Sequence, residues 1–199
     1  MRVLVACEYS GIVREAFAAR GHDAWSCDLL PTDQPSEKHI QGDVLEILDD
    51  NWDLIIAHPP CTHLSVSGAS RWAEKVADGR QPAAIKFVES IWDADCPRIC
   101  IENPVGALST RSKLGKASQY VQPFQFGHGE QKKTGFWLKG LPKLKPTEYV
   151  DVSHLPDKER QRLHWLPPSK DRWKIRSTTF QGIADAMAHQ FSDYLLNND

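Results

Sequence analysis

The chain has 199 residues, 41% of them hydrophobic and 25% charged, and a formal net charge of −2. This length and apolar content predict one compact domain, residues 1–199, with a sizeable core. No stretch approaches the roughly 20 apolar residues of a membrane span. An acidic residue follows the first apolar run, where a signal peptide would continue its apolar core. We therefore expect a cytoplasmic protein with no membrane partner.

The five cysteines are odd in number and none belongs to a CxxC pair, which argues against a disulfide framework and a structural zinc site. We expect reduced thiols and no metal. Residues 131–176 carry 12 Lys or Arg against 5 Asp or Glu, whereas residues 1–130 carry 12 against 18. The basic segment fits an anionic partner such as nucleic acid, and it also fits a solvated charged face.

The first 28 residues have the pattern of a β-α-β unit. Residues 2–7 predict a buried strand, residues 11–21 have the apolar spacing of a helix, and residues 22–28 predict a second strand that ends at Asp28. An acidic residue at that position of a Rossmann-type unit can bind ribose hydroxyls. Gly11 stands alone where a dinucleotide fingerprint has three glycines. A nucleoside cofactor without a pyrophosphate would need fewer.

Residues 29–41 are polar and contain prolines, so they predict a loop. Asp43 follows, and it either caps a short helix over residues 44–48 or contacts a ligand.

A candidate nucleophile comes next. Residues 54–57 (LIIA) predict a strand buried on both faces. Pro59 and Pro60 end it, so Cys61 lies on a stiff turn at its carboxyl edge, where ligands bind in open α/β sheets. Cys61 is therefore a candidate nucleophile, with an ordinary loop cysteine as the alternative. Residues 65–80 are small and polar and predict a mobile active-site loop.

After a predicted helix over residues 81–92, residues 98–101 predict another strand, which Glu102 follows. We expect Pro104 to stop strand pairing. Glu102 lies at the same sheet edge as Cys61 if the two strands are neighbours. By itself it could equally cap a helix or loop.

The rest of the chain has weaker signals until its last helix. Residues 112–127 predict a helix or loop, with a strand as a further alternative, and residues 132–140 predict a strand. Residues 140–177 are basic and proline-rich and predict a mostly irregular excursion. Residues 182–196 have the apolar spacing of an amphipathic helix.

The segment around Cys61, PCTHLSVSG, resembles the nucleophile motif PCQxFSxxG of the DNA cytosine-5 methyltransferases. Pro60, Cys61, Ser65 and Gly68 match, whereas Thr62 and Leu64 differ. Glu102, Asn103 and Pro104 resemble the family's ENV tripeptide, and residues 131–135 (QKKTG) resemble its QxRxR segment less closely. Residues 9–22 resemble its cofactor loop and first helix, and residues 178–188 its C-terminal segment. These segments follow the family's order over nearly the whole chain.

The resemblance implies an α/β, Rossmann-like S-adenosylmethionine-dependent methyltransferase fold with a mostly parallel sheet and helices on both faces. It implies methylation of cytosine at C5, in which Cys61 attacks C6 of the base. Glu102, with a raised pKa, would protonate N3. Lys133 falls where the family has an arginine that contacts the base, although a lysine cannot copy a bidentate guanidinium contact.

For S-adenosylmethionine, the resemblance implies contacts near the methionine end from the β-α loop, a ribose contact from Asp28 and an adenine contact from Asp43. The implied cofactor-binding residues are Tyr9, Ser10, Gly11, Asp28, Asp43 and Pro59.

The partner implied is DNA, duplex or single-stranded. Residues 140–177 stand where the family has a target-recognition domain, and they are too short for an independent one. Specificity would be relaxed or supplied by a protein partner. The implied nucleic-acid contacts are Ser65, Arg172, Lys174 and Arg176. Trp165 and Trp173 could stack on bases or pack inward.

Two further functions stay open. One is methylation of a free cytosine nucleotide, and the other is a non-catalytic protein that binds cofactor or DNA. Methylation of an amino group is less favoured, because His58 and Cys61 flank the two prolines where such enzymes usually have an acidic or amide residue and an aromatic one.

Overall fold

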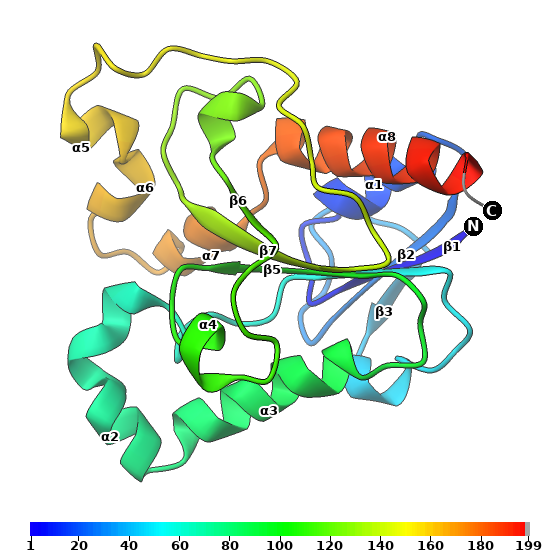
Figure 1. The fold of residues 1–199 in the computed structure, drawn as a ribbon, viewed down its shortest axis with the longest axis horizontal. Helices are drawn as coiled ribbons and strands as arrows, with labels where there is room; N and C mark the ends of the chain where they lie inside the picture. The colour runs from blue at the N-terminus through cyan, green and yellow to red at the C-terminus, as the bar shows by residue number, and fades with distance from the viewer. Residues whose placement is uncertain (198–199) are drawn as a thin grey trace.

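The structure is a computed structural model that describes residues 1–197, and its centre is a seven-stranded sheet in the order β3-β2-β1-β4-β5-β7-β6 (Figure 1). The strands are β1 (Arg2–Ala6), β2 (Asp23–Asp28), β3 (His39–Gln41), β4 (Leu54–Ala57), β5 (Ile99–Pro104), β6 (Gln119–Val121) and β7 (Thr134–Lys139). β7 runs antiparallel to β5 and β6, and the pairs from β3 to β5 are parallel. The strand order reverses between β1 and β4, which is where open α/β sheets bind ligands.

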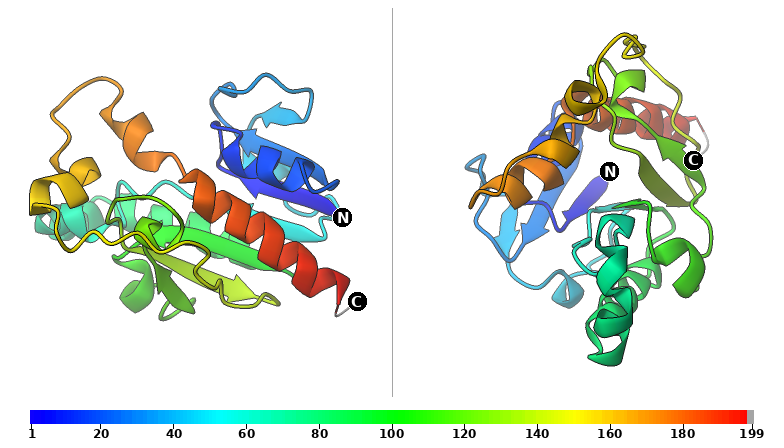
Figure 2. Two further views of the ribbon diagram at one scale, coloured as in Figure 1. Left: turned by 90° about the horizontal axis from the view of Figure 1, so that it is seen from above. Right: turned by 90° about the vertical axis from the view of Figure 1, so that its left-hand side faces the viewer.

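Helices cover both faces of the sheet, as Figures 1 and 2 show. α1 (Ile12–Ala18) and α8 (Gln181–Leu196) lie on one face, and α2 (Trp72–Ala77), α3 (Arg80–Trp92) and α4 (Leu108–Arg111) lie on the other. α5 (Asp157–Arg160), α6 (Arg162–Trp165) and α7 (Arg172–Ser177) lie at one end. The predicted α/β, Rossmann-like architecture is confirmed, with a mostly parallel sheet and helices on both faces. Within the described residues, no helix is long and apolar enough to cross a membrane.

The apolar run of β4 separates two cores. Leu54 and Ile56 belong to the cluster under α1 and α8, whereas Ile55 and Ala57 belong to the cluster over α3. Successive side chains of a strand point to opposite faces, so a central strand needs apolar residues at every position. The prediction of a strand buried on both faces is confirmed, since all four residues are buried.

Three predictions about local structure were wrong. Residues 39–41 of the predicted loop form β3, which pairs with β2 although two of its three residues are polar. β5 continues to Pro104, which pairs with Thr134 of β7. Proline is tolerated there because β4 ends opposite Ile101, so this part of β5 has no partner on that side.

The third concerns residues 65–80, predicted as a loop, which form the 3₁₀ helix η2 (Val66–Arg71) and α2. Residues 140–177 form an excursion that, as predicted, is largely irregular, although α5, α6 and α7 interrupt it. The 3₁₀ helices η1 (Val44–Glu46) and η3 (Pro123–Gln125) complete the described elements.

α8 offers a matched pair of substitutions that tests the core. Phe191 is fully buried and Leu196 is 76% exposed on the same helix. Phe191→Ala should lower the free energy of unfolding by about 3–5 kcal/mol, and Leu196→Ala by less than about 0.5 kcal/mol. Urea unfolding followed by circular dichroism measures both values. Equal losses would contradict the packing of α8 described above.

Candidate active site

Polar side chains follow the apolar ones on the face of the sheet that α1 and α8 cover, at the carboxyl edge of the strands. Ile56 of β4 pairs with Cys100 of β5, so His58 and Glu102, two residues further along each chain, lie side by side on this face. The His58 amide donates to the Ala6 carbonyl at 2.9 Å, which fixes its backbone. His58 Nδ1 lies 3.2 Å from Glu102 Oε2.

Glu102 is largely buried, with 16% of its side chain exposed, and it is ionised. Burial pushes the pKa of its carboxyl group upward, but hydrogen bonds from His58 and Thr134 and the charge of Lys132 bring the pKa below its ordinary value. The expectation of a raised pKa was therefore wrong for the protein without a ligand. The physical reason is the set of donors around the carboxylate, which outweighs its desolvation.

Cys61 lies on the turn that follows the two prolines. Its carbonyl accepts the amides of Leu64 and Ser65, each at 2.9 Å. Burial raises the pKa of the thiol, and the negative charge of Glu102 raises it further, against the opposing charges of Lys132 and Arg176. Cys61 and Glu102 are thus close enough to influence each other electrostatically, and the resting pair is a thiol beside a carboxylate.

The segment around Cys61 is held by side chains from three other elements. The hydrogen bonds run from Asn103 Nδ2 to the Pro59 carbonyl (2.9 Å), from Lys75 Nζ to the Thr62 carbonyl (2.7 Å) and from Gln81 Nε2 to the His63 carbonyl (2.8 Å). Ser65 also forms a β-bridge with Gly106, where a Cβ atom would lie 2.0 Å from the Leu64 carbonyl oxygen. These contacts position the thiol on a fixed turn.

The two lysines of the QKKTG segment have different surroundings. Lys132 Nζ donates to the Arg176 carbonyl at 2.8 Å, and its charge acts on both Cys61 and Glu102. Lys133 Nζ lies 4.8 Å from the centre of the Tyr120 ring instead. The structure thus brings Lys132 to the candidate nucleophile, rather than the Lys133 that the motif indicated.

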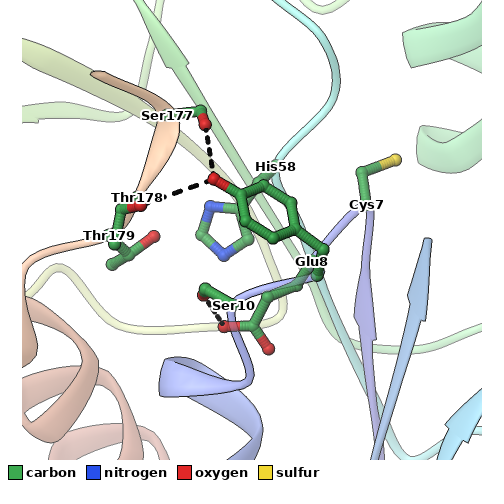
Figure 3. Close-up of a pocket in the computed structure, with 8 residues that line it drawn as sticks. Cys7, Glu8, Ser10, His58, Ser177, Thr178 and Thr179 are labelled. Carbon is green, nitrogen blue, oxygen red and sulfur yellow. Dashed lines mark hydrogen bonds between the residues drawn. The ribbon is translucent and has the colours of Figure 1, made fainter. Parts of the chain in front are cut away.

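A small pocket opens where β1 ends, beside His58 (Figure 3). It encloses about 40 Å³ and is lined by Cys7, Glu8, Tyr9, Ser10, His58, Ser177, Thr178 and Thr179. The Tyr9 hydroxyl lies 3.1 Å from both the Lys174 carbonyl and Ser177 Oγ, so the end of α7 lies against the β1–α1 loop. Thr178 and Thr179, at the start of the segment that resembles the family's C-terminal segment, also line this pocket.

Glu8, which sequence reasoning missed, occupies the amino-terminal end of α1. Its carboxylate accepts the amides of Val13 (2.7 Å) and Arg14 (3.2 Å) and the hydroxyl of Ser10 (3.1 Å). A helix N-terminus normally attracts anions, and here the protein supplies its own. Gly11 precedes the helix at φ 74°, and a Cβ atom there would lie 2.8 Å from Arg14 Nη2. Glycine is therefore required at this position by the backbone conformation and by the close approach of Arg14.

The other predicted cofactor residues lie at the same edge. Asp28 ends β2, half-buried, and burial raises the pKa of its carboxyl group. Asp43 accepts the Leu45 amide at 3.0 Å and caps η1, as its helix-cap alternative predicted. Both carboxylates act electrostatically on Cys7, which lines the pocket. Pro59 is buried next to His58.

The predicted nucleic-acid residues are only partly free for a ligand. Lys174 Nζ forms an ion pair with Asp33 at 2.6 Å, and Arg172 Nη2 donates to the His164 carbonyl at 3.3 Å. Ser65 caps η2. Arg176 lies near enough to Cys61 to lower the pKa of its thiol, against the burial that raises it.

The two tryptophans of the excursion are exposed rather than packed inward. Trp165 and Trp173 each expose 54% of their surface. One side of Trp173 faces the Tyr9 ring, at 5.7 Å between ring centres. The alternative of inward packing is therefore wrong for both.

All five cysteines, which lie within the described residues, are free thiols. Within residues 1–197, no group of three or more His, Cys, Asp or Glu side chains could hold a metal ion.

Comparison with known proteins adds one structural likeness. No family model matches the chain, and no curated protein matches it. Among solved structures, it is similar to an E. coli protein described as a "putative DNA modification methyltransferase encoded within prophage", with 17% sequence identity and a TM-score of 0.49. The match covers 79% of this chain, and this chain spans 56% of that protein.

The two lysines offer a matched test of the thiol environment. At a fixed alkaline pH, Lys132→Met should slow alkylation of Cys61 by iodoacetamide roughly fivefold, because losing a nearby cation raises the thiol pKa and lowers the thiolate fraction. Lys133→Met should leave the rate unchanged. Because the Cys61 pKa lies above its ordinary value, the wild-type rate should still be rising beyond the pH at which an ordinary thiol has ionised.

Mass spectrometry of the Cys61 peptide gives the rate for this thiol alone. A slower rate in Lys133→Met than in Lys132→Met would contradict the assignment.

Proposed function

We propose that the protein transfers a methyl group from S-adenosylmethionine to C5 of cytosine in DNA, with Cys61 as nucleophile and Glu102 as acid. The observation that carries the proposal is that Cys61 and Glu102 interact at adjoining strand ends, next to the pocket at the end of β1. The fold is compatible with many reactions, so the proposal rests on these residues rather than on the fold.

The pocket residues fit a nucleoside cofactor that has no phosphate. Glu8 already satisfies the amino-terminal end of α1, so a pyrophosphate would meet a carboxylate there instead of free amides. The pocket, at about 40 Å³, has room for a few water-sized groups. It would hold the amino-acid end of the ligand, with the nucleoside extending along the sheet edge toward Asp28. S-adenosylmethionine supplies an electrophilic methyl group when bound.

The reactive state differs from the resting state by the position of one proton. When the Cys61 proton moves to Glu102, the thiolate forms a bond to C6 and the C5–C6 π pair moves to C4–C5. The C4–N3 π pair moves to N3, which takes the proton from Glu102. C5 would then be nucleophilic enough to take the methyl group from S-adenosylmethionine, which would leave as S-adenosylhomocysteine. Afterwards a base removes the C5 proton, the S–C6 bond breaks, and the N3 proton returns to Glu102. Lys132 would stabilise both the thiolate and the carboxylate.

DNA as substrate is supported by the excursion over residues 140–177. It carries exposed aromatic rings and many cations next to the site. Such surfaces bind phosphates by charge and stack on exposed bases without much sequence readout. A short excursion of this kind fits relaxed specificity, or specificity supplied by a protein partner.

Cys61→Ser tests the chemistry. It should lower methyl transfer roughly a thousandfold or more, because a serine hydroxyl is a far weaker nucleophile than a thiolate. Binding of S-adenosylmethionine should stay at the wild-type level. The measurement is transfer of labelled methyl to duplex DNA, single-stranded DNA and dCMP, with 5-methyldeoxycytidine identified after digestion. Full activity of the serine variant would rule out the covalent mechanism.

The same assay separates the two alternatives. Transfer to dCMP but not to DNA would select the free nucleotide as substrate. Binding of cofactor and DNA without any transfer would select a non-catalytic protein.

Trp165 tests the role of the excursion. If its exposed ring stacks on a base, Trp165→Ala should weaken binding of a single-stranded oligonucleotide about tenfold. Tyr149→Ala is the control, because Tyr149 is an exposed aromatic of the same excursion that packs edge-on against Phe124. Fluorescence anisotropy at several salt concentrations measures both affinities. Equal effects of the two substitutions would contradict a specific role for Trp165.

A further inference from the structure

His58 has a polar atom in the pocket that no protein group satisfies. Its side chain is only 8% exposed, and Nε2 is buried without a hydrogen-bond partner. Figure 3 shows the imidazole among the residues that line the pocket. A buried polar atom without a partner is costly, so its presence in a pocket indicates a ligand group that completes it.

The hydrogen bond at Nδ1 determines whether the ligand group at Nε2 is a donor or an acceptor. Glu102 is ionised and can only accept hydrogen bonds, so His58 Nδ1, at 3.2 Å, must donate its proton to it. In the neutral ring Nε2 is then an acceptor. The ligand group that meets it is a donor.

The charges around the ring favour a cationic donor. The titratable and charged groups that surround His58 are Glu102 from β5, Lys132 before β7, and Cys7, Glu8 and Tyr9 from the β1–α1 loop. The Glu8 carboxylate already accepts hydrogen bonds from α1. The positive charge of Lys132 acts on Glu102 and Cys61, which lie beyond Nδ1 of the ring. An ammonium group at Nε2 would have the Glu102 carboxylate directly behind the ring.

We propose that His58 is a positioning residue that joins the pocket to Glu102: Nε2 accepts a hydrogen bond from the ammonium of a ligand's amino-acid end, and Nδ1 holds the Glu102 carboxylate. The proposal rests on the proposed function for the identity of that ligand. Its consequence is that the cofactor and the catalytic acid are linked through one ring, so a bound amino-acid end orients the imidazole that holds Glu102.

Two substitutions separate the two nitrogens. His58→Asn keeps an amide donor near the position of Nδ1 and removes the atom in the pocket. His58→Gln places its amide near Nε2 and removes the donor to Glu102. The surface histidine variant His154→Asn is the control, because His154 is exposed on the excursion.

Calorimetry with S-adenosylhomocysteine, which has the ammonium, and methylthioadenosine, which lacks it, measures the first contact. His58→Asn should weaken binding of S-adenosylhomocysteine roughly tenfold and leave methylthioadenosine unchanged. His58→Gln should bind both like the wild type.

Carbon-13 NMR of the Glu102 carboxyl group measures the second contact. The Nδ1 donor stabilises the carboxylate, so His58→Gln should raise the pKa of Glu102 and shift its titration to higher pH. His58→Asn should keep the wild-type titration. Nitrogen-15 NMR of the wild-type protein should find the proton on Nδ1 of His58.

The outcomes separate the role proposed for His58 from the proposed function on which it rests. If the wild type binds S-adenosylhomocysteine but both variants behave alike, or if the proton lies on Nε2, the role of His58 is overturned and the proposed function stands. If the wild type binds neither ligand, the proposed cofactor fails, and the ligand contact of His58 fails with it.

Discussion

The parallel pairing of β4 with β5 is the constraint on which the candidate site depends. Because Ile56 lies opposite Cys100, the residues that follow on the same face, His58 and Glu102, meet at the carboxyl edge of the sheet. A shift of this register by one residue would turn one of the two side chains to the other face and bury it against α3. The apolar residues of both strands fix the register, since they must fill a core on each side. Packing energy in the sheet thereby positions polar groups that could not hold themselves together.

The site combines a backbone held in place by hydrogen bonds with a proton that the proposed reaction must move from Cys61 to Glu102. Asn103, Lys75 and Gln81 hold the turn that carries Cys61, so little conformational entropy remains to be lost when a substrate binds. Cys61 and Glu102 form a coupled pair in which each negative charge disfavours the other. At rest the proton is on sulfur, whereas the proposed reaction needs it on the carboxyl group. Such a pair stays unreactive until a nucleobase and a cofactor alter its surroundings. This limits alkylation of the half-buried Cys61 thiol in the free protein.

The sequence allowed prediction of those elements whose pattern is set by burial. The four apolar residues of β4 and the amphipathic spacing of α8 identify both elements, because a central strand and a helix on a sheet have few alternatives. β3 could not be predicted, since it has only three residues, two of them polar, and exists only through pairing with β2. Lys132 and Lys133 could not be told apart, because a strand's facing changes with every residue and the motif there is imperfect. The partners of Glu102 and the free Nε2 of His58 depend on contacts between distant residues, which no local pattern contains.

The central claim is that Cys61 forms a covalent bond to C6 of a cytosine. DNA that contains 5-fluorodeoxycytidine tests it most directly, because fluorine at C5 cannot leave as a proton does, and the adduct persists. After incubation with such DNA and S-adenosylmethionine, denaturation and proteolysis, the account predicts a nucleotide attached to the peptide that contains Cys61. An unmodified Cys61 peptide from protein that has methylated ordinary DNA under the same conditions would contradict it.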